Sequence, residues 1–138
     1  MKKSSKASAL IISLLILSIM LLVGLSVSIT TVKEQKSAME SEKSSIAYQI
    51  AESGVEYAMQ RLLDNSGLQI RNIPGFGECL NGGFTRNEGG GQNVIEFLED
   101  DGDGVSCNRP ASEVQVIKSS GSFKNVTRAI HAPVVFLP

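Results

Sequence analysis

The sequence predicts an α+β protein. A long N-terminal α-helix, transmembrane in its first half and amphipathic in its second half, is expected to pack on a small antiparallel β-sheet with a disulfide-stapled loop. Three observations predict this class. An uncharged run covers residues 7–32, a helical pattern without proline continues to Leu63, and short strand-like segments follow toward the C-terminus. With 138 residues, the chain has room for one small domain beyond the apolar run.

The apolar run directly follows a basic N-terminal peptide that carries Lys2, Lys3 and Lys6. A helix of this length reaches about 39 Å, which is enough to cross a hydrocarbon core of about 30 Å. Because positive charge stays in the cytoplasm, everything beyond Val32 is expected to lie outside it. The run is also longer than the apolar core of a secretory signal peptide, which spans about 7–15 residues.

An amphipathic half continues the helix. Small and apolar side chains recur there at spacings of three and four, namely Ala47, Ile50, Ala51, Val55, Ala58, Met59 and Leu62. The turn-forming residues 64–67 then end the helix, so we expect it to run from about Ser8 to Leu63. The organisation that follows is a basic leader peptide at 1–7, a transmembrane half at 8–32, an amphipathic half at 33–64, and a small β-rich domain with glycine-rich loops at 65–138.

The β-rich region begins with a glycine-rich stretch, residues 67–104, in which only residues 93–98 look like a strand. Beyond it, residues 113–118 alternate polar and apolar side chains, Ser119–Ser122 is expected to form a turn, and residues 123–136 supply a longer strand. The prediction is a hairpin near the C-terminus. Because so short a sheet is marginal alone, the amphipathic helix face is its natural cover.

The two cysteines, Cys79 and Cys107, both lie in the region expected outside the cytoplasm, where disulfides persist. A bridge between them would close a loop of about 28 residues and contribute about 3 kcal/mol. Two sulfurs without a nearby histidine or second cysteine pair do not make a zinc site. The sequence therefore predicts a disulfide.

A candidate Ca²⁺ site lies at the end of the glycine-rich stretch, before Cys107. Glu99, Asp101 and Asp103 stand there beside Gly102 and Gly104, which permit tight curvature, and carboxylate oxygens suit a hard cation. The position where an EF-hand has a bidentate glutamate is Pro110 here, so the match is partial. A solvated acidic turn is the alternative. In either case no cofactor is required.

The helical part of the chain resembles a known family. The segments Lys6-Ala-Ser-Ala-Leu-Ile-Ile-Ser-Leu-Leu15 and Tyr48-Gln-Ile-Ala-Glu-Ser-Gly-Val-Glu56 are similar to those of type IV pilin-like proteins. More narrowly, they resemble the PilX-type minor pilins and the K-type minor pseudopilins of type II secretion. The resemblance covers Lys6 to about Leu63, and the C-terminal residues 120–130 are loosely similar to the closing strands of such proteins.

The resemblance implies a way of processing and a position in a filament. A prepilin peptidase would cut between Ala7 and Ser8 and N-methylate Ser8, although the usual residue before the cut is glycine. Ile12 stands at the fifth mature position, where most pilins have a glutamate thought to neutralise the terminal amine of a neighbouring subunit. K-type pseudopilins also lack this glutamate and are placed at the filament tip. By resemblance, the chain is a minor subunit at the tip or at the start of a filament.

The implied partners are other pilin-like subunits through the N-terminal helix, the prepilin peptidase, an inner-membrane assembly platform and the lipid bilayer. The chain would be stored in the inner (cytoplasmic) membrane as a single span with its C-terminus outside the cytoplasm, and would then enter a filament or reach the cell surface. Membrane residence agrees with the apolar run, because hydrocarbon side chains are stable in lipid.

Two other functions stay open. A membrane-anchored or secreted calcium-dependent adhesive domain would never enter a filament, and cleavage before Val27 by a conventional signal peptidase would release it. An enzyme is not expected, because the single histidine, His131, has no recognisable catalytic partners. A net charge of −1 gives no strong nucleic-acid signal. Four residues suggest a weakly basic or simply solvated edge: Arg109, Lys118, Lys124 and Arg128.

Overall fold

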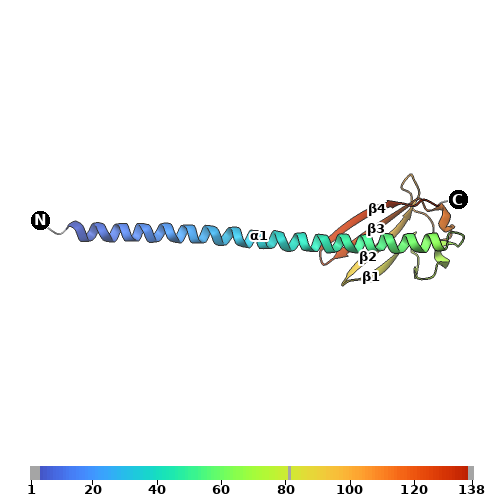
Figure 1. The fold of residues 1–138 in the computed structure, drawn as a ribbon, viewed down its shortest axis with the longest axis horizontal. Helices are drawn as coiled ribbons and strands as arrows, with labels where there is room; N and C mark the ends of the chain where they lie inside the picture. Colours follow the sequence, from blue (N-terminus) through green and yellow to red (C-terminus); the bar gives the residue numbers. More distant parts are fainter. Residues whose placement is uncertain (1–3, 81, 137–138) are drawn as a thin grey trace. The chain divides into compact units, whose positions relative to one another are not determined.

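The structure, a computed structural model, describes residues 4–80 and 82–136, with side chains from Ala9 onward. It is an α+β fold (Figure 1). One helix, α1 (Ser4–Asp64), precedes a four-stranded sheet made of β1 (Gly83–Glu88), β2 (Gly91–Leu98), β3 (Val116–Phe123) and β4 (Val126–Pro133). Two short 3₁₀ turns, η1 (Ile70–Asn72) and η2 (Ala111–Glu113), lie in the connections. The helix and its end at residues 64–67 confirm the sequence prediction.

The chain divides into two compact units, Met1–Glu40 and Ser41–Pro138. The described part of the first unit is helix alone, and every side chain from Ala9 to Glu40 is exposed. The second unit contains the rest of α1, the sheet and the loops. Its strands follow one another as a meander, in the order β1-β2-β3-β4, and all neighbours are antiparallel.

Two-residue turns join the outer strand pairs of this meander. Gly89 and Gly90 connect β1 to β2 with positive φ angles of 58° and 78°, which glycine adopts without strain. Lys124 and Asn125 connect β3 to β4, and Lys124 also has a positive φ, 54°. Because strands β1 to β4 are joined in this way, both turns lie at the same end of the sheet.

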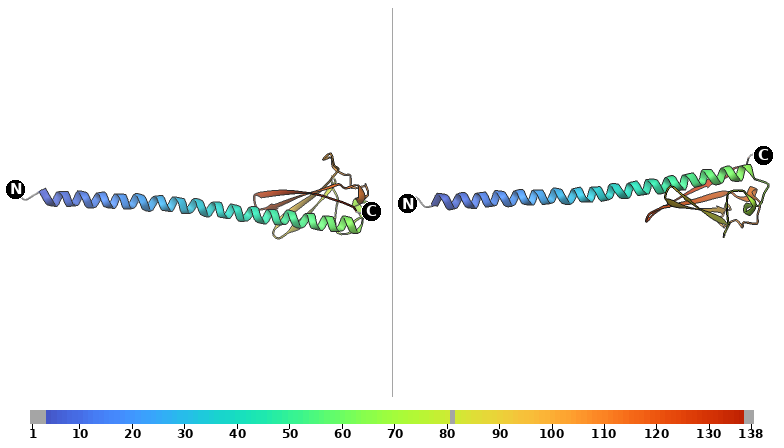
Figure 2. Two further views of the ribbon diagram at one scale, coloured as in Figure 1. Left: turned by 45° about the horizontal axis from the view of Figure 1, so that its top comes forward. Right: turned by 90° about the horizontal axis from the view of Figure 1, so that it is seen from below.

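The second half of α1 covers one face of the sheet (Figure 2). Its buried face consists of Ala47, Ile50, Ala51, Gly54, Val55, Ala58 and Leu62, so the predicted apolar stripe is confirmed, although Met59 is only partly buried. Small residues bring the two layers close together. A Cβ added to Gly121 on β3 would lie 2.2 Å from the carbonyl oxygen of Ala47, which leaves no room for a side chain there.

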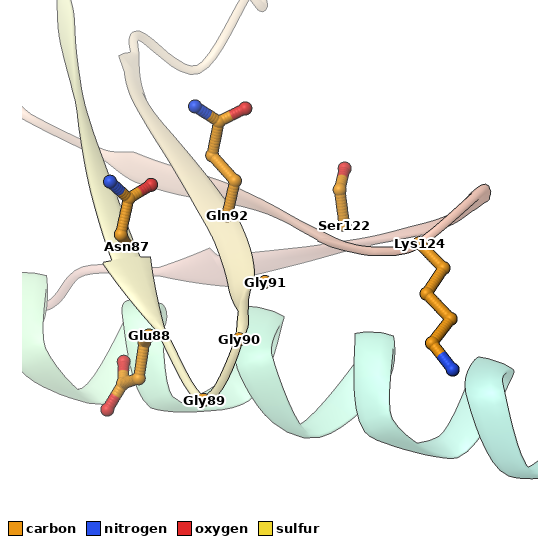
Figure 3. A pocket seen from close by; sticks show the side chains of 8 residues that line it. All are labelled: Asn87, Glu88, Gly89, Gly90, Gly91, Gln92, Ser122 and Lys124. Atoms are coloured by element: carbon orange, nitrogen blue, oxygen red, sulfur yellow. The ribbon is translucent and has the colours of Figure 1, made fainter.

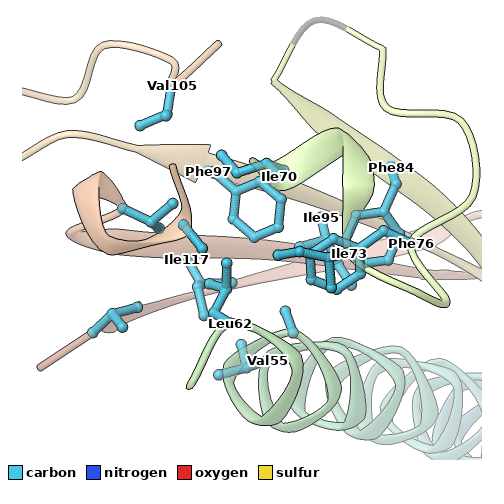
Figure 4. Packing of buried hydrophobic residues seen from close by; sticks show 14 residues of the cluster. Val55, Leu62, Ile70, Ile73, Phe76, Phe84, Ile95, Phe97, Val105 and Ile117 are labelled. Carbon is cyan, nitrogen blue, oxygen red and sulfur yellow. The ribbon is translucent and has the colours of Figure 1, made fainter. Parts of the chain in front are cut away.

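The hydrophobic core lies between the helix, the sheet and the connecting loops (Figure 4). Ile95, Phe97 and Ile117 come from the sheet, and each is fully buried. The segment after α1 adds an aromatic contact, because the rings of Phe76 and Phe84 stack with their centroids 4.3 Å apart. The loop after the helix is therefore part of the core, and it fixes the helix end against β1.

Two details of the predicted strands are wrong. Ser119–Ser122 lies within β3, and the turn is at Lys124 and Asn125. The physical reason is the close approach of the helix, which requires small residues in the strand beneath it. The sequence prediction also assigned residues 83–88 to a loop, but they form the edge strand β1. An edge strand has one unpaired side and tolerates the polar residues that made this segment look like a loop.

Candidate functional site

The N-terminal apolar segment, residues 9–32, contains most of the exposed large hydrophobic side chains that the structure describes. Over the described residues, α1 is the one helix long and apolar enough to cross a membrane, and its most apolar part is not buried. Leu14 and Met20 are 69% and 71% exposed. So much exposed hydrocarbon is unfavourable in water, so this segment favours an apolar environment.

The hydroxyl groups of this segment are satisfied within the helix. The Oγ of Ser13 donates to the carbonyl oxygen of Leu10 at 2.9 Å, and the Oγ of Ser28 donates to that of Gly24 at 3.0 Å. Ser18, Ser26, Thr30 and Thr31 make the same kind of bond to a carbonyl three or four residues earlier. None of these hydroxyls needs water or a partner chain, so the segment presents a surface fit for hydrocarbon on all sides.

The residues of the predicted processing site lie at the start of α1. Lys2 and Lys3 lie outside the described residues, whereas Lys6, Ala7 and Ser8 are within the helix, although their side chains are not described. Ile12 follows one helical turn after Ser8 and is 57% exposed. Its branched hydrocarbon side chain cannot accept a proton or pair with an amine. Ile12 is therefore as apolar as the residues that surround it in the sequence.

The predicted disulfide between Cys79 and Cys107 is confirmed. Backbone hydrogen bonds surround it: the N–H of Arg71 donates to the carbonyl of Cys107 at 3.0 Å, and the N–H of Ile70 donates to that of Arg109 at 3.0 Å. The Nη1 of Arg71 also donates to the Oδ1 of Asn108 at 2.6 Å. The bridge therefore fastens the loop after β2 to the segment between η1 and β1, and the backbone hydrogen bonds join the same loop to η1.

The predicted calcium ligands lie in a tight exposed turn. The N–H of Gly102 donates to the carbonyl of Glu99, and the N–H of Asp103 donates to the Oδ1 of Asp101 at 3.1 Å. Glu99 forms an ion pair with Arg109, which also pairs with Glu113 at 2.9 Å. Within residues 4–80 and 82–136, no three acidic, histidine or cysteine side chains converge as metal ligands. Calcium binding stays a prediction, and it would compete with Arg109 for Glu99.

The contact between the helix and the sheet contains buried polar residues that the sequence reasoning missed. The Nδ2 of Asn93 on β2 donates to the carbonyl of Ile50 at 2.5 Å, and its Oδ1 accepts from the Oγ of Ser119 at 2.8 Å. Asn93 and Ser119 are both fully buried. The available signal was an asparagine two residues before Ile95, at a position that the alternation of the strand places on the same side as Ile95 and Phe97.

The turn of α1 that follows Ile50 also contacts the edge strand β1. The Oγ of Ser53 donates to the Oε2 of Glu88 on β1 at 2.9 Å. Gly54 lies directly over Asn93 and Ser119, and a Cβ there would come within 1.9 Å of the Asn93 Nδ2. Ala51 and Val55 are buried beside it. The segment 51–55, Ala-Glu-Ser-Gly-Val, is thus a part of the helix that closely contacts the sheet, and Glu52 is its exposed residue.

The weakly basic edge does not act as one charged surface. Lys118 pairs with Glu96 at 2.6 Å, and Arg109 is paired as described above. His131 lies opposite Lys118 on the neighbouring strand β4 and is exposed. Lys124 and Arg128 remain without a carboxylate partner among the side chains that the structure describes.

Comparison with known proteins gives one match. Residues 8–56 match the PilX N-terminal family, a span that begins at the predicted first mature residue and ends just after the segment 51–55. The match supports a relation to PilX-like type IV pilins over this helix. No curated protein and no solved structure matches the chain.

Proposed function

We propose that this chain, whose residues 8–56 match the PilX N-terminal family, is a minor subunit of a type IV pilus-like or pseudopilus filament. It is inserted in the inner membrane as a single span and assembled through its N-terminal helix. The observation that carries the proposal is the fully exposed apolar segment with internally satisfied hydroxyls. Such a helix is stable in lipid and equally stable in a bundle of similar helices, so it can pass from one to the other.

The movement of the apolar segment from lipid into a helix bundle needs no catalytic step from the subunit. An assembly platform extracts the chain, and the apolar segment exchanges lipid contacts for helix contacts without exposure to water. Serine and glycine within the segment allow neighbouring helices to approach closely. The second unit has its own core and disulfide, so it can stay folded during the exchange.

Ile12 supports a position at the tip or in an initiating complex. A carboxylate in hydrocarbon is costly unless it is paired, and in pilins it pairs with the terminal amine of the adjoining subunit. A subunit with isoleucine cannot provide that pair. Because a subunit at the end of a filament has fewer neighbours to satisfy, the substitution is tolerated best there.

Filament incorporation tests this proposal. The full chain is expressed in cells with a type IV pilus machine, filaments are sheared and purified, and the chain is detected in the filament and membrane fractions. We expect a small amount in filaments. Leu17→Lys, which places a charge in the apolar segment, should abolish it, whereas Gln60→Lys, an exposed helix position in the second unit, should not. A chain that never appears with filaments would contradict the proposal.

A further inference from the structure

We propose that Arg109 is the resident cation of the loop between β2 and β3, residues 99–115, and that this loop keeps its conformation without calcium. The guanidinium of Arg109 pairs with Glu99 and with Glu113, two carboxylates from different parts of the loop. The inference goes beyond the filament role proposed above and does not depend on it. It bears instead on the alternative function, a calcium-dependent adhesive domain.

The acidic turn at the start of this loop is closed by bonds within the protein. The N–H of Glu99 donates to the carbonyl of Asp103 at 2.9 Å, and the N–H of Gly102 donates to the carbonyl of Glu99 at 3.1 Å. Gly102 has a positive φ of 89°, which glycine adopts without strain. The Oδ1 of Asp101 accepts from the N–H of Asp103 at 3.1 Å. The turn thus takes its shape from hydrogen bonds of its own.

The side chain of Arg109 joins the two ends of the loop. Its Nη1 contacts the Oε1 of Glu99, next to the end of β2, and its Nε lies 2.9 Å from the Oε2 of Glu113 in η2. The two nitrogens belong to one planar fork, whose fixed geometry suits two carboxylate oxygens. A divalent cation between two carboxylates would have the same role. Because Glu99 is already paired, such a cation would have to displace Arg109.

The backbone of Arg109 fixes the position from which this side chain extends. Its carbonyl accepts from the N–H of Ile70 at 3.0 Å, and its own N–H donates to the carbonyl of Ser106 at 2.9 Å. Ile70 is fully buried in the core, and Cys107, two residues before Arg109, is bridged to Cys79. The guanidinium therefore extends from a segment that the core and the disulfide hold, and it fastens the more exposed acidic turn to that segment.

The other cations of this domain differ from Arg109 in their pairing. Among the side chains that the structure describes, Arg86 pairs with one carboxylate, and so does Lys118. Lys124 lines a pocket of about 560 Å³ at the turn between β1 and β2 (Figure 3), but it forms no ion pair with a described carboxylate. Within this described set, Arg109 alone joins two carboxylates. A neutral side chain in its place would leave both carboxylates without their cation.

The exposure of these ion pairs limits what they contribute to overall stability. The side chains of Arg109 and Glu113 are 49% and 43% exposed, so water and salt screen the pair. The expected effect is therefore on local opening of the loop. Exchange of backbone amide hydrogens measures such opening directly, even where the whole domain stays folded.

Hydrogen exchange of the oxidised full chain in detergent, followed by mass spectrometry, tests the proposal. Exchange in residues 99–113 is compared in excess Ca²⁺ and in a chelator, and we expect the wild-type chain to exchange equally in both. Arg109→Gln should speed exchange of this segment about two- to fivefold at low salt, and less at high salt, because salt screens the ion pairs. Arg128→Gln, the same change at an exposed arginine on β4, is the matched control and should leave the segment unchanged.

Arg109→Lys distinguishes a fork that holds two carboxylates from a simple positive charge. Lysine has one compact ammonium in place of the fork, so this variant should exchange at a rate between those of the wild-type chain and Arg109→Gln. Slower exchange of the wild-type segment in Ca²⁺ than in the chelator, or wild-type exchange in Arg109→Gln, would overturn the proposal. The first of these results would favour the adhesive domain. The filament fractions and the N-terminal processing report on the proposed function separately.

Discussion

The side chain of Asn93 on β2 donates through its Nδ2 to the backbone carbonyl of Ile50 on α1, at a distance of 2.5 Å. This bond joins the helix to the sheet, and both Asn93 and Ile50 are buried. The oxygen of the amide accepts from Ser119, so both the nitrogen and the oxygen of the Asn93 side chain have a partner inside the protein. A buried polar group is stable only when it is paired in this way.

Asn93→Ala should destabilise the second unit by about 1–3 kcal/mol, because the Ser119 hydroxyl then lacks its partner and a small cavity remains. Urea unfolding of the full chain in detergent, followed by circular dichroism, measures the loss. Asn87→Ala is the control, since Asn87 is an exposed asparagine on the adjacent strand β1. Equal losses in both variants would show that the buried bond contributes nothing of its own.

Gly54→Ala should also be destabilising, although alanine favours a helix over glycine by about 1 kcal/mol. The added Cβ would lie 1.9 Å from the Asn93 Nδ2 and 2.6 Å from the Ser119 Oγ, so either these side chains shift and lose their hydrogen bonds or the helix moves away from the sheet. Overpacking of this kind costs about 1–3 kcal/mol. Gly24→Ala is the control, because nothing lies within 4 Å of its Cβ position. A more stable Gly54→Ala variant would disprove the close contact.

Removal of the disulfide should lower the free energy of unfolding by about 3–4 kcal/mol, the loop-closure value for the separation of 28 residues between Cys79 and Cys107. The double variant Cys79→Ser with Cys107→Ser is compared with the reduced wild-type chain by chemical denaturation. Both should lose the same amount. An unchanged unfolding midpoint would mean that the core holds the loop without the bridge.

Ile12→Glu should increase the amount of the chain in purified filaments, if the missing carboxylate restricts the chain to the filament tip. The glutamate can pair with a terminal amine and allow the chain to occupy internal positions. Quantitative mass spectrometry of sheared filaments measures the ratio to the major subunit. Ile11→Glu places the same charge one residue earlier and should not have this effect. Equal ratios for all three chains would contradict the interpretation of Ile12.

Much of the fold could be predicted from the sequence because its signals are local. The apolar run, the helix face from Ala47 to Leu62 and the disulfide each depend on residue type and spacing, and the structure confirms them. An uncharged run as long as residues 7–32 also has few structural alternatives to a helix. The candidate segment at residues 9–32 was therefore visible before any tertiary contact was known.

The strand details could not be predicted because they depend on contacts between distant residues. Ser119 and Gly121 look like a turn in isolation, but the helix above them selects small residues within β3. Asn93 is buried only because Ile50 and Ser119 satisfy it. Lys124 occupies a turn that sequence rules assign to asparagine or glycine. For Asn93, Ser119 and Gly121, a tertiary contact outweighs the local preference, whereas nothing in the structure explains the lysine at position 124.

We propose that the chain is processed and assembled as a pilin-like subunit. The most direct test is the N-terminal sequence and intact mass of the protein after co-expression with a prepilin peptidase. We expect a chain that begins at Ser8 and carries one additional methyl group. A chain that begins at Val27 would have lost most of its apolar segment and would contradict pilin-like processing.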